Sequence, residues 1–154
     1  MLLAPLFSQL PECGSSIGYA DNILTMAKTE HDAVAMVKAL WSALEAHCAG
    51  HLIPNAPKIF NPGQAIEFLG HSIRRISGGV HIEPAQKHRT KFEATIAQSL
   101  NEIKKAAADP VPVVPLREKL KRYVNSWTSA FKLCTDISGY QATALAKIDA
   151  AIEK

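Results

Sequence analysis

Near the start of the chain the spacing of apolar residues changes from a pattern typical of a β-hairpin to one typical of a helix. In residues 17–28, IGYADNILTMAK, short apolar runs flank Asp21 and Asn22, whose small side chains tolerate a tight turn. The pattern predicts a β-hairpin with Asp21-Asn22 as its turn. From Thr29 onward the period is helical, and Asp32 three positions later completes a variant of the capping box. We expect this helix to stop at Gly50 and its apolar stripe to contain Ala33, Val34, Val37, Leu40, Trp41, Leu44 and Cys48.

The middle of the chain has the pattern of short strands, and the end has that of helices. PKIF (57–60) and AIEFLGHSIRRISGGVHI (65–82) predict three or four strands with a turn at Gly78-Gly79. After Pro84 the pattern is helical. Helices are predicted over 85–108, about 116–134 and from about 139, with DPVPVVP as a rigid break after the first of them.

This order of elements predicts an α+β fold with two lobes. Residues 1–83 are expected to form an antiparallel sheet with an amphipathic helix, and residues 84–154 an all-helical lobe. The charge differs between the halves, although the whole chain carries only +3. Residues 1–70 hold three basic and six acidic side chains, and the rest holds fourteen and eight. This distribution of charge is expected for an acidic metal centre followed by a lobe that contacts phosphates. It is equally expected if acidic and basic residues were distributed over surface helices by chance.

The three cysteines, Cys13, Cys48 and Cys134, form no CxxC pair, so neither a zinc ribbon nor a disulfide framework is indicated. We therefore expect a reducing, cytoplasmic compartment. The opening MLLAPLFSQL lacks the basic start of a signal peptide, and Pro5 and Gln9 interrupt its apolar run. No stretch approaches the ~20 apolar residues of a membrane span, and no membrane partner is expected.

Several of these segments arrive in a familiar order. The chain resembles the reverse transcriptases of bacterial retroelements, in the group II intron and retron lineage, over roughly 2–134. GYADNIL resembles the Tyr-x-Asp-Asp catalytic hairpin, NAPKIF the strand whose lysine sits near the incoming nucleotide, and IEFLGHSI the primer-grip hairpin. LLAPLF is similar to the end of the helix after the template-contacting motif, and the helices after Pro84 occupy the place of the thumb. The order and spacing carry this resemblance, since each motif alone is short.

The resemblance implies a partial polymerase palm followed by a thumb-like lobe, and phosphoryl transfer with Mg²⁺. Polymerases clamp the reacting oxygens between two metal ions about 3.5–4 Å apart. Asp21 is then the metal ligand, Asn22 its catalytic neighbour, and Tyr19 lies beneath the site near the primer end. Lys58 is the electrostatic partner or proton donor of pyrophosphate. From the residues alone, Asp21 is equally a turn residue with an Asx-turn hydrogen bond, and Lys58 a solvated lysine.

The resemblance also implies residues that hold nucleic acid. Phe68, Leu69 and Gly70 form the primer grip, where a glycine permits close backbone approach. As bare sequence these three residues read as a buried strand. Six cations of the helical lobe are expected to contact phosphates of an RNA or DNA template–primer duplex. They are Lys87, Arg89, Lys91, Arg117, Lys121 and Arg122. Solvated helix faces account for the same charges.

Two departures from the family bear on activity. Asn22 replaces the second carboxylate of the hairpin, which keeps an oxygen ligand but removes one charge. The family's other essential carboxylate lies on a strand well upstream, and no acidic residue precedes Glu12. The fingers, which hold template and deoxynucleoside triphosphate, are also absent from these residues. We therefore expect that this polypeptide does not polymerise alone and needs the missing N-terminal half, for example as a partner in trans.

Two alternatives come from other classes. One is a non-catalytic nucleic-acid-binding remnant, in which the helical lobe is retained on a decayed palm; its binding is salt-dependent and needs no Mg²⁺. The other is a degenerate gene product without activity. An incomplete palm exposes a sheet edge, so poor solubility or dependence on a partner chain favours that reading.

Overall fold

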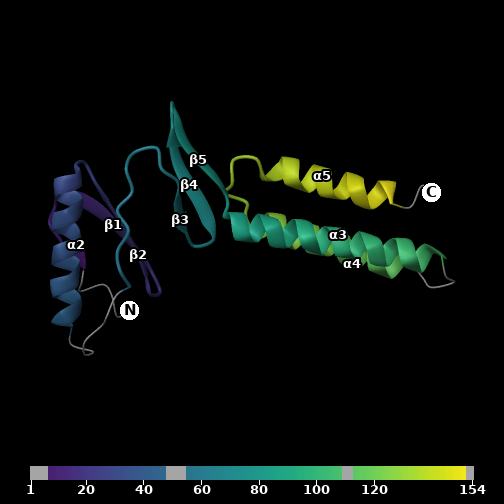
Figure 1. Cartoon of the computed structure of the whole chain (residues 1–154), viewed down its shortest axis with the longest axis horizontal. Coiled ribbons are helices and arrows are strands. Elements are labelled where there is room, and N and C mark those ends of the chain that lie inside the picture. Colours follow the sequence, from purple (N-terminus) through teal and green to yellow (C-terminus); the bar gives the residue numbers. More distant parts are fainter. Residues whose placement is uncertain (1–6, 48–54, 109–112, 152–154) are drawn as a thin grey trace. The chain divides into compact units, whose positions relative to one another are not determined.

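The computed structural model describes residues 7–47, 55–108 and 113–151 (Figure 1). Its contacts divide the chain into two compact units, Met1–Gln64 and Ala65–Lys154. Each unit combines strands with helices, so the predicted α+β class is confirmed. Among the described residues, no helix has both the length and the apolarity that a membrane crossing requires.

The first unit is built on an antiparallel hairpin of β1 (Gly14–Tyr19) and β2 (Asn22–Ala27). The predicted pairing is confirmed, but the turn lies one residue earlier than expected. Asn22 already pairs with Tyr19, so Ala20 and Asp21 form the turn, and Ala20 has a φ of +53°. The prediction placed the turn by the propensity of Asp and Asn, whereas the ladder of backbone hydrogen bonds decides where it closes.

Helix α2 (Glu30–Glu45) covers one face of this hairpin. The hydroxyl of Thr29 accepts a hydrogen bond from the Asp32 N–H at 3.1 Å and donates to the Asp32 carboxylate at 2.7 Å, which confirms the predicted cap. A Cβ on Gly14 would clash with the Met26 backbone carbonyl and lie 2.5 Å from the Met36 sulfur, so only glycine fits there. Met36, Ala43 and Leu44 are buried.

The C-terminal end of α2 and the set of residues that it buries differ from the prediction. The helix ends at Glu45, earlier than expected, and Cys48 and Gly50 lie outside the described residues. Trp41 is 38% exposed, because the buried side of the helix is centred on Met36 and Leu44. Of the segment LLAPLF, only Phe7 is described; its ring packs against Gly18.

The second unit begins with a three-stranded antiparallel sheet in the order β3 (Ile66–Phe68), β4 (His71–Ile76) and β5 (Gly79–Pro84). Ile73 at its centre pairs with Ile66 and Ile82. Because Ile76 pairs with Gly79, the β4–β5 turn is Ser77-Gly78 and not the expected Gly78-Gly79.

Three helices follow: α3 (Gln86–Ala108), α4 (Val113–Ala130) and α5 (Ile137–Ala150). Helix α4 packs against both α3 and α5. The predicted helices are confirmed, although α4 begins within the expected break DPVPVVP. Pro115 is accommodated because the first turn of a helix needs no N–H donor at that place. Their common core contains Phe92, Ile96, Ile103, Leu120, Val124, Ala144 and Ile148.

The sheet of the second unit is joined to its helices by backbone hydrogen bonds. Thr135 donates its N–H to the Ile82 carbonyl at 2.7 Å, and its hydroxyl accepts from the Ile82 N–H at 3.1 Å. The Ala85 N–H donates to the Gly70 carbonyl at 2.8 Å. These bonds place residues 65–83 in the same unit as the helices. The boundary between residues 83 and 84 was predicted from the resemblance, as the division between palm and thumb, and it stays a prediction.

Candidate catalytic hairpin and cationic helices

Asp21 lies in the exposed β1–β2 turn, where its carboxylate accepts a hydrogen bond from the Asn22 side-chain amide at 2.9 Å. Tyr19 lies opposite Asn22 on the same face of the hairpin and is 64% exposed. The short turn thus brings together Tyr19, Asp21 and Asn22. The left-handed conformation of Ala20 costs roughly 1–2 kcal/mol relative to ordinary backbone, so the turn is held against a local preference.

The turn can contribute to a metal site but does not complete one. Mg²⁺ prefers six oxygen ligands in octahedral geometry, and Asp21 and Asn22 offer one carboxylate and one amide oxygen. Within residues 7–47, 55–108 and 113–151, no group of three or more His, Cys, Asp or Glu side chains is arranged to hold a metal ion. These two side chains can supply part of the ligand set of one metal ion. The remaining ligands would have to come from other residues or from substrate.

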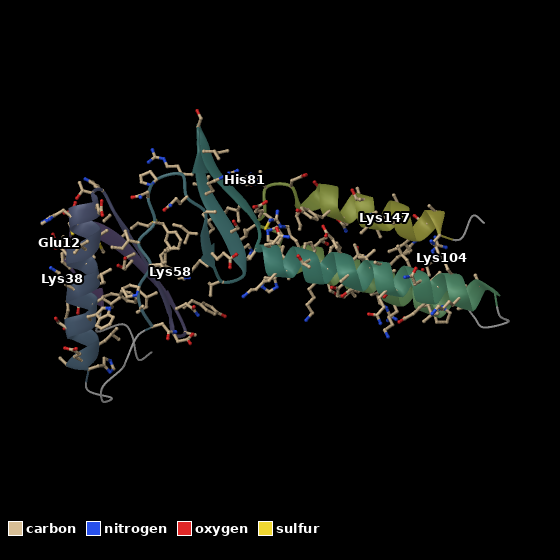
Figure 2. All side chains as sticks on the ribbon, viewed as in Figure 1. Glu12, Lys38, Lys58, His81, Lys104 and Lys147 are labelled. Carbon is tan, nitrogen blue, oxygen red and sulfur yellow. The ribbon has the colours of Figure 1, made fainter. Side chains whose placement is uncertain are left out.

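Lys58 lies in the irregular segment 55–64 of the first unit (Figure 2). The expected strand over 57–60 is wrong. Pro57 has no N–H for a ladder, and the described residues provide no neighbouring strand for this segment. Ile59 and Phe60 beside it are 47% and 38% exposed. The part of Lys58 in catalysis stays a prediction.

Phe68, Leu69 and Gly70 form the end of β3 and the turn to β4. Leu69 and Gly70 both have positive φ, +49° and +80°, and Leu69 is 44% exposed. The positive φ of Gly70 favours glycine, and a Cβ there would lie 3.0 Å from the His88 ring, which would have to shift by a few tenths of an ångström. The turn therefore presents an exposed apolar side chain on a strained backbone, not the buried strand of the alternative reading.

Sequence reasoning missed the residues that hold this turn. His71 places its Nδ1 3.0 Å from the Leu69 carbonyl, and the rings of His71 and His88 lie 5.2 and 5.6 Å from that of Phe131. The sequence carries no sign of this cluster, because its members come from β4, from α3 and from the residue that follows α4.

Three of the six predicted phosphate-binding cations are paired with carboxylates. Arg89 donates to Glu83 at 2.7 Å, and Arg117 and Lys121 lie 2.6 and 3.1 Å from Asp149. Hydrogen bonds from Arg117 and Lys121 lower the pKa of Asp149 below its usual value. Lys87, Lys91 and Arg122 are exposed and make no ion pair within the described residues. Of the six predicted cations, these three have no carboxylate partner among the described residues, so their charges are available to a polyanion.

A cavity of about 450 Å³ separates α3 from α5. Its walls include the buried side chains of Phe92, Ile96 and Ala144, with Glu93 and Lys147 among the polar residues at its rim. Lys147 on α5 and Lys104 on α3 are labelled in Figure 2. The rings of Phe92 and Trp127 are stacked with their centroids 4.0 Å apart, so Trp127 packs against the core of the helices.

Comparisons with protein-family models, curated proteins and solved structures found no match. The resemblance to reverse transcriptases therefore rests on the sequence motifs, and the residue roles that it implies stay predictions. The hairpin gathers Tyr19, Asp21 and Asn22 in the first unit, and the turn of Phe68, Leu69 and Gly70 belongs to the second.

Proposed function

We propose that this chain is the palm-and-thumb part of an RNA-directed DNA polymerase of the bacterial retroelement type. The observation that carries the proposal is the antiparallel β1–β2 hairpin with Asp21 in its two-residue turn, followed directly by an amphipathic helix. An apolar β3–β4 turn at Phe68, Leu69 and Gly70 and three helices follow in the order that the resemblance requires. In this proposal, template-directed DNA synthesis also needs fingers and a second acidic strand supplied by another segment.

In this proposal each residue acts through ordinary chemistry. The Asp21 carboxylate, with the Asn22 amide oxygen beside it, would hold Mg²⁺, and a bound Mg²⁺ would supply Lewis-acid polarisation of the phosphoryl group of the incoming deoxynucleoside triphosphate. Tyr19 packs near the primer end. Lys58 offsets negative charge on the departing pyrophosphate. The Leu69-Gly70 turn contacts the primer backbone, and Lys87, Lys91 and Arg122 contact duplex phosphates without reading bases.

The test is to read the coding sequence upstream of Met1 in frame, and to express any encoded acidic strand joined to this chain. Incorporation of deoxynucleotides on an RNA template with a DNA primer and Mg²⁺ is the readout. The joined chain should extend the primer, the 154-residue chain should not, and Asp21→Ala should abolish extension in the joined chain. Primer extension that survives Asp21→Ala would contradict the proposal, as would the lack of any such upstream coding sequence.

A second function, non-catalytic nucleic-acid binding, is favoured by the unpaired charges of Lys87, Lys91 and Arg122. Here the chain binds an RNA–DNA duplex without Mg²⁺, and log affinity falls linearly with log salt. Replacing the three cations by Gln should weaken binding and reduce the salt slope by about 0.9 for each phosphate that is no longer neutralised. Replacing the paired Arg89, Arg117 and Lys121 should change the slope less. Equal effects of the two triple variants would contradict this reading.

A further inference from the structure

Within the part of the chain that the structure describes, the outer edge of β1 carries unpaired backbone groups. Within the described residues, β1 pairs only with β2. The Tyr19–Asn22 pair closes the two-residue turn, and hydrogen-bonded and non-hydrogen-bonded pairs alternate from there. The N–H and C=O groups of Gly14, Ser16 and Gly18 therefore point away from β2. None of them makes a backbone hydrogen bond elsewhere in the described parts of the chain. The edge is able to pair with another strand.

This edge lacks the features that normally prevent strand addition. Proteins protect sheet edges with charged side chains, proline, bulges or covering elements. β1, GSSIGY, has no charge and no proline, and its register with β2 is continuous over six residue pairs. Helix α2 packs more on β2 than on β1, and β1 is the more exposed strand. Within the described residues the β1 edge is therefore open, with the Phe7 ring against Gly18 near one end.

Apolar side chains accompany the open edge. The Gly14 side of the hairpin faces Met36 of α2, and the opposite side presents Ile17 and Tyr19, which are 51% and 64% exposed. Met26 on β2 belongs to the same uncovered side and is 49% exposed. A strand added at β1 would cover part of Ile17 and Tyr19 and would leave Met26 at the far strand unchanged.

We propose that a second copy of this chain occupies the edge, with β1 of each copy paired antiparallel about a two-fold axis. An uncharged strand can face itself without bringing like charges together, which homotypic pairing of a charged edge would do. The product is a continuous four-stranded sheet, and sheets of three or more strands are more stable than an isolated hairpin. With the axis at Ser16, Gly14 of one copy lies opposite Gly18 of the other.

The strength of this contact follows from its size. Stable interfaces bury about 1,200–2,000 Å² in total, and the edge of a six-residue strand with two half-exposed side chains provides less. The dimer is therefore weak and depends on concentration. Its formation does not require the polymerase function proposed above, and dimerisation is measured without nucleotide, template or Mg²⁺.

Sedimentation velocity of the full chain from micromolar to millimolar concentration tests the proposal. We expect a shift from monomer to dimer as concentration rises. Ile17→Lys should weaken dimerisation at least about tenfold, because the two new charges become diagonal neighbours across the axis. Met26→Lys is the matched control, with similar exposure on the same side, and should leave dimerisation unchanged. An equimolar mixture of Ile17→Lys and Ile17→Glu should recover it.

A second measurement guards against variants that do not fold. Amide hydrogen exchange of the wild-type chain at low and high concentration should show added protection at Gly14, Ser16 and Gly18, whose N–H groups point outward. The amides of Ile17 and Tyr19 already bond to β2 and should change little. A monomer at every concentration would overturn the proposal. So would an equal effect of Ile17→Lys and Met26→Lys, since it would indicate nonspecific apolar adhesion.

Discussion

At the scale of single residues, the Asp21 turn combines a carboxylate with an amide that donates to it. A second carboxylate in place of Asn22 would remove that donor and add an oxygen ligand of full charge. The metal affinity of carbonyl and carboxylate sites rises with the number of charged ligands. The chemistry of position 22 therefore sets how strongly the turn binds a divalent cation.

Asn22→Asp should raise the Mn²⁺ affinity of the chain about threefold to tenfold, since Mn²⁺ binds the same oxygen ligands as Mg²⁺. Titration of Mn²⁺ followed by water-proton relaxation measures this. Ser15→Asp adds the same charge at an exposed position of β1 away from the turn and should have little effect. An equal gain in both variants would mean that net charge, not the turn, binds the ion.

The glycine of the β3–β4 turn is required for two reasons, and these can be separated. Gly70→Ala should lower the free energy of unfolding by about 1–2 kcal/mol through backbone strain, plus the cost of moving His88. Gly78→Ala, at φ +87° with no atom within 4 Å, carries strain alone and should cost less. Urea unfolding in a Trp41→Phe background, followed by Trp127 fluorescence, reports on this unit. Equal costs would argue against the His88 contact.

At the scale of elements, most predictions from local pattern succeeded, the strand over 57–60 being an exception, and predictions of register did not. The α2 cap, the hairpin pairing and the three C-terminal helices follow from neighbours along the chain. Both hairpin turns lie one residue earlier than expected, at Ala20-Asp21 and Ser77-Gly78. Turn propensity favours Asp, Asn and Gly wherever they occur, but the closing pair is chosen by the whole ladder.

Thr29→Ala tests the best-defined local element. The variant loses the hydroxyl that caps α2 and should destabilise this helix by about 1 kcal/mol. Hydrogen exchange of the α2 amides measures the change within the first unit. Ser42→Ala, at an exposed position inside the same helix, should leave exchange unchanged or slow it slightly because Ala favours helix. If Thr29→Ala leaves exchange unchanged, the cap contributes little to α2.

At the scale of the whole molecule, the sheet of the second unit is coupled to the helices through the segment after α4. Thr135 bonds to β5, and Cys134 beside it is buried. Burial raises the pKa of the Cys134 thiol above its ordinary value, with the Glu83 charge adding to the effect. The thiol therefore stays protonated in the folded chain at a pH where the unfolded chain loses the proton.

The protonated Cys134 thiol adds to the free energy of unfolding, and this contribution is fully present below about pH 8.5, the ordinary pKa of cysteine. It declines as the pH rises through the raised pKa of the folded chain. In urea unfolding at about pH 7 and pH 9.5, on either side of that ordinary value, the wild-type chain should lose more stability than Cys134→Ala. Cys13→Ala, at a half-exposed position, should behave as the wild type does. Parallel pH profiles for all three chains would contradict the assignment.

The sequence by itself determined the α+β class, the hairpin with Asp21 in its turn and the helix order, because these depend on periodicity and on neighbours along the chain. Tertiary structure alone decided which charges are available. Asp149 neutralises Arg117 and Lys121 from a different helix, far away in sequence. It likewise decided that the His88 ring packs closely on Gly70, and that β1 pairs only with β2 among the described residues. Contacts between distant segments arise only when the chain is packed, and no local pattern encodes them.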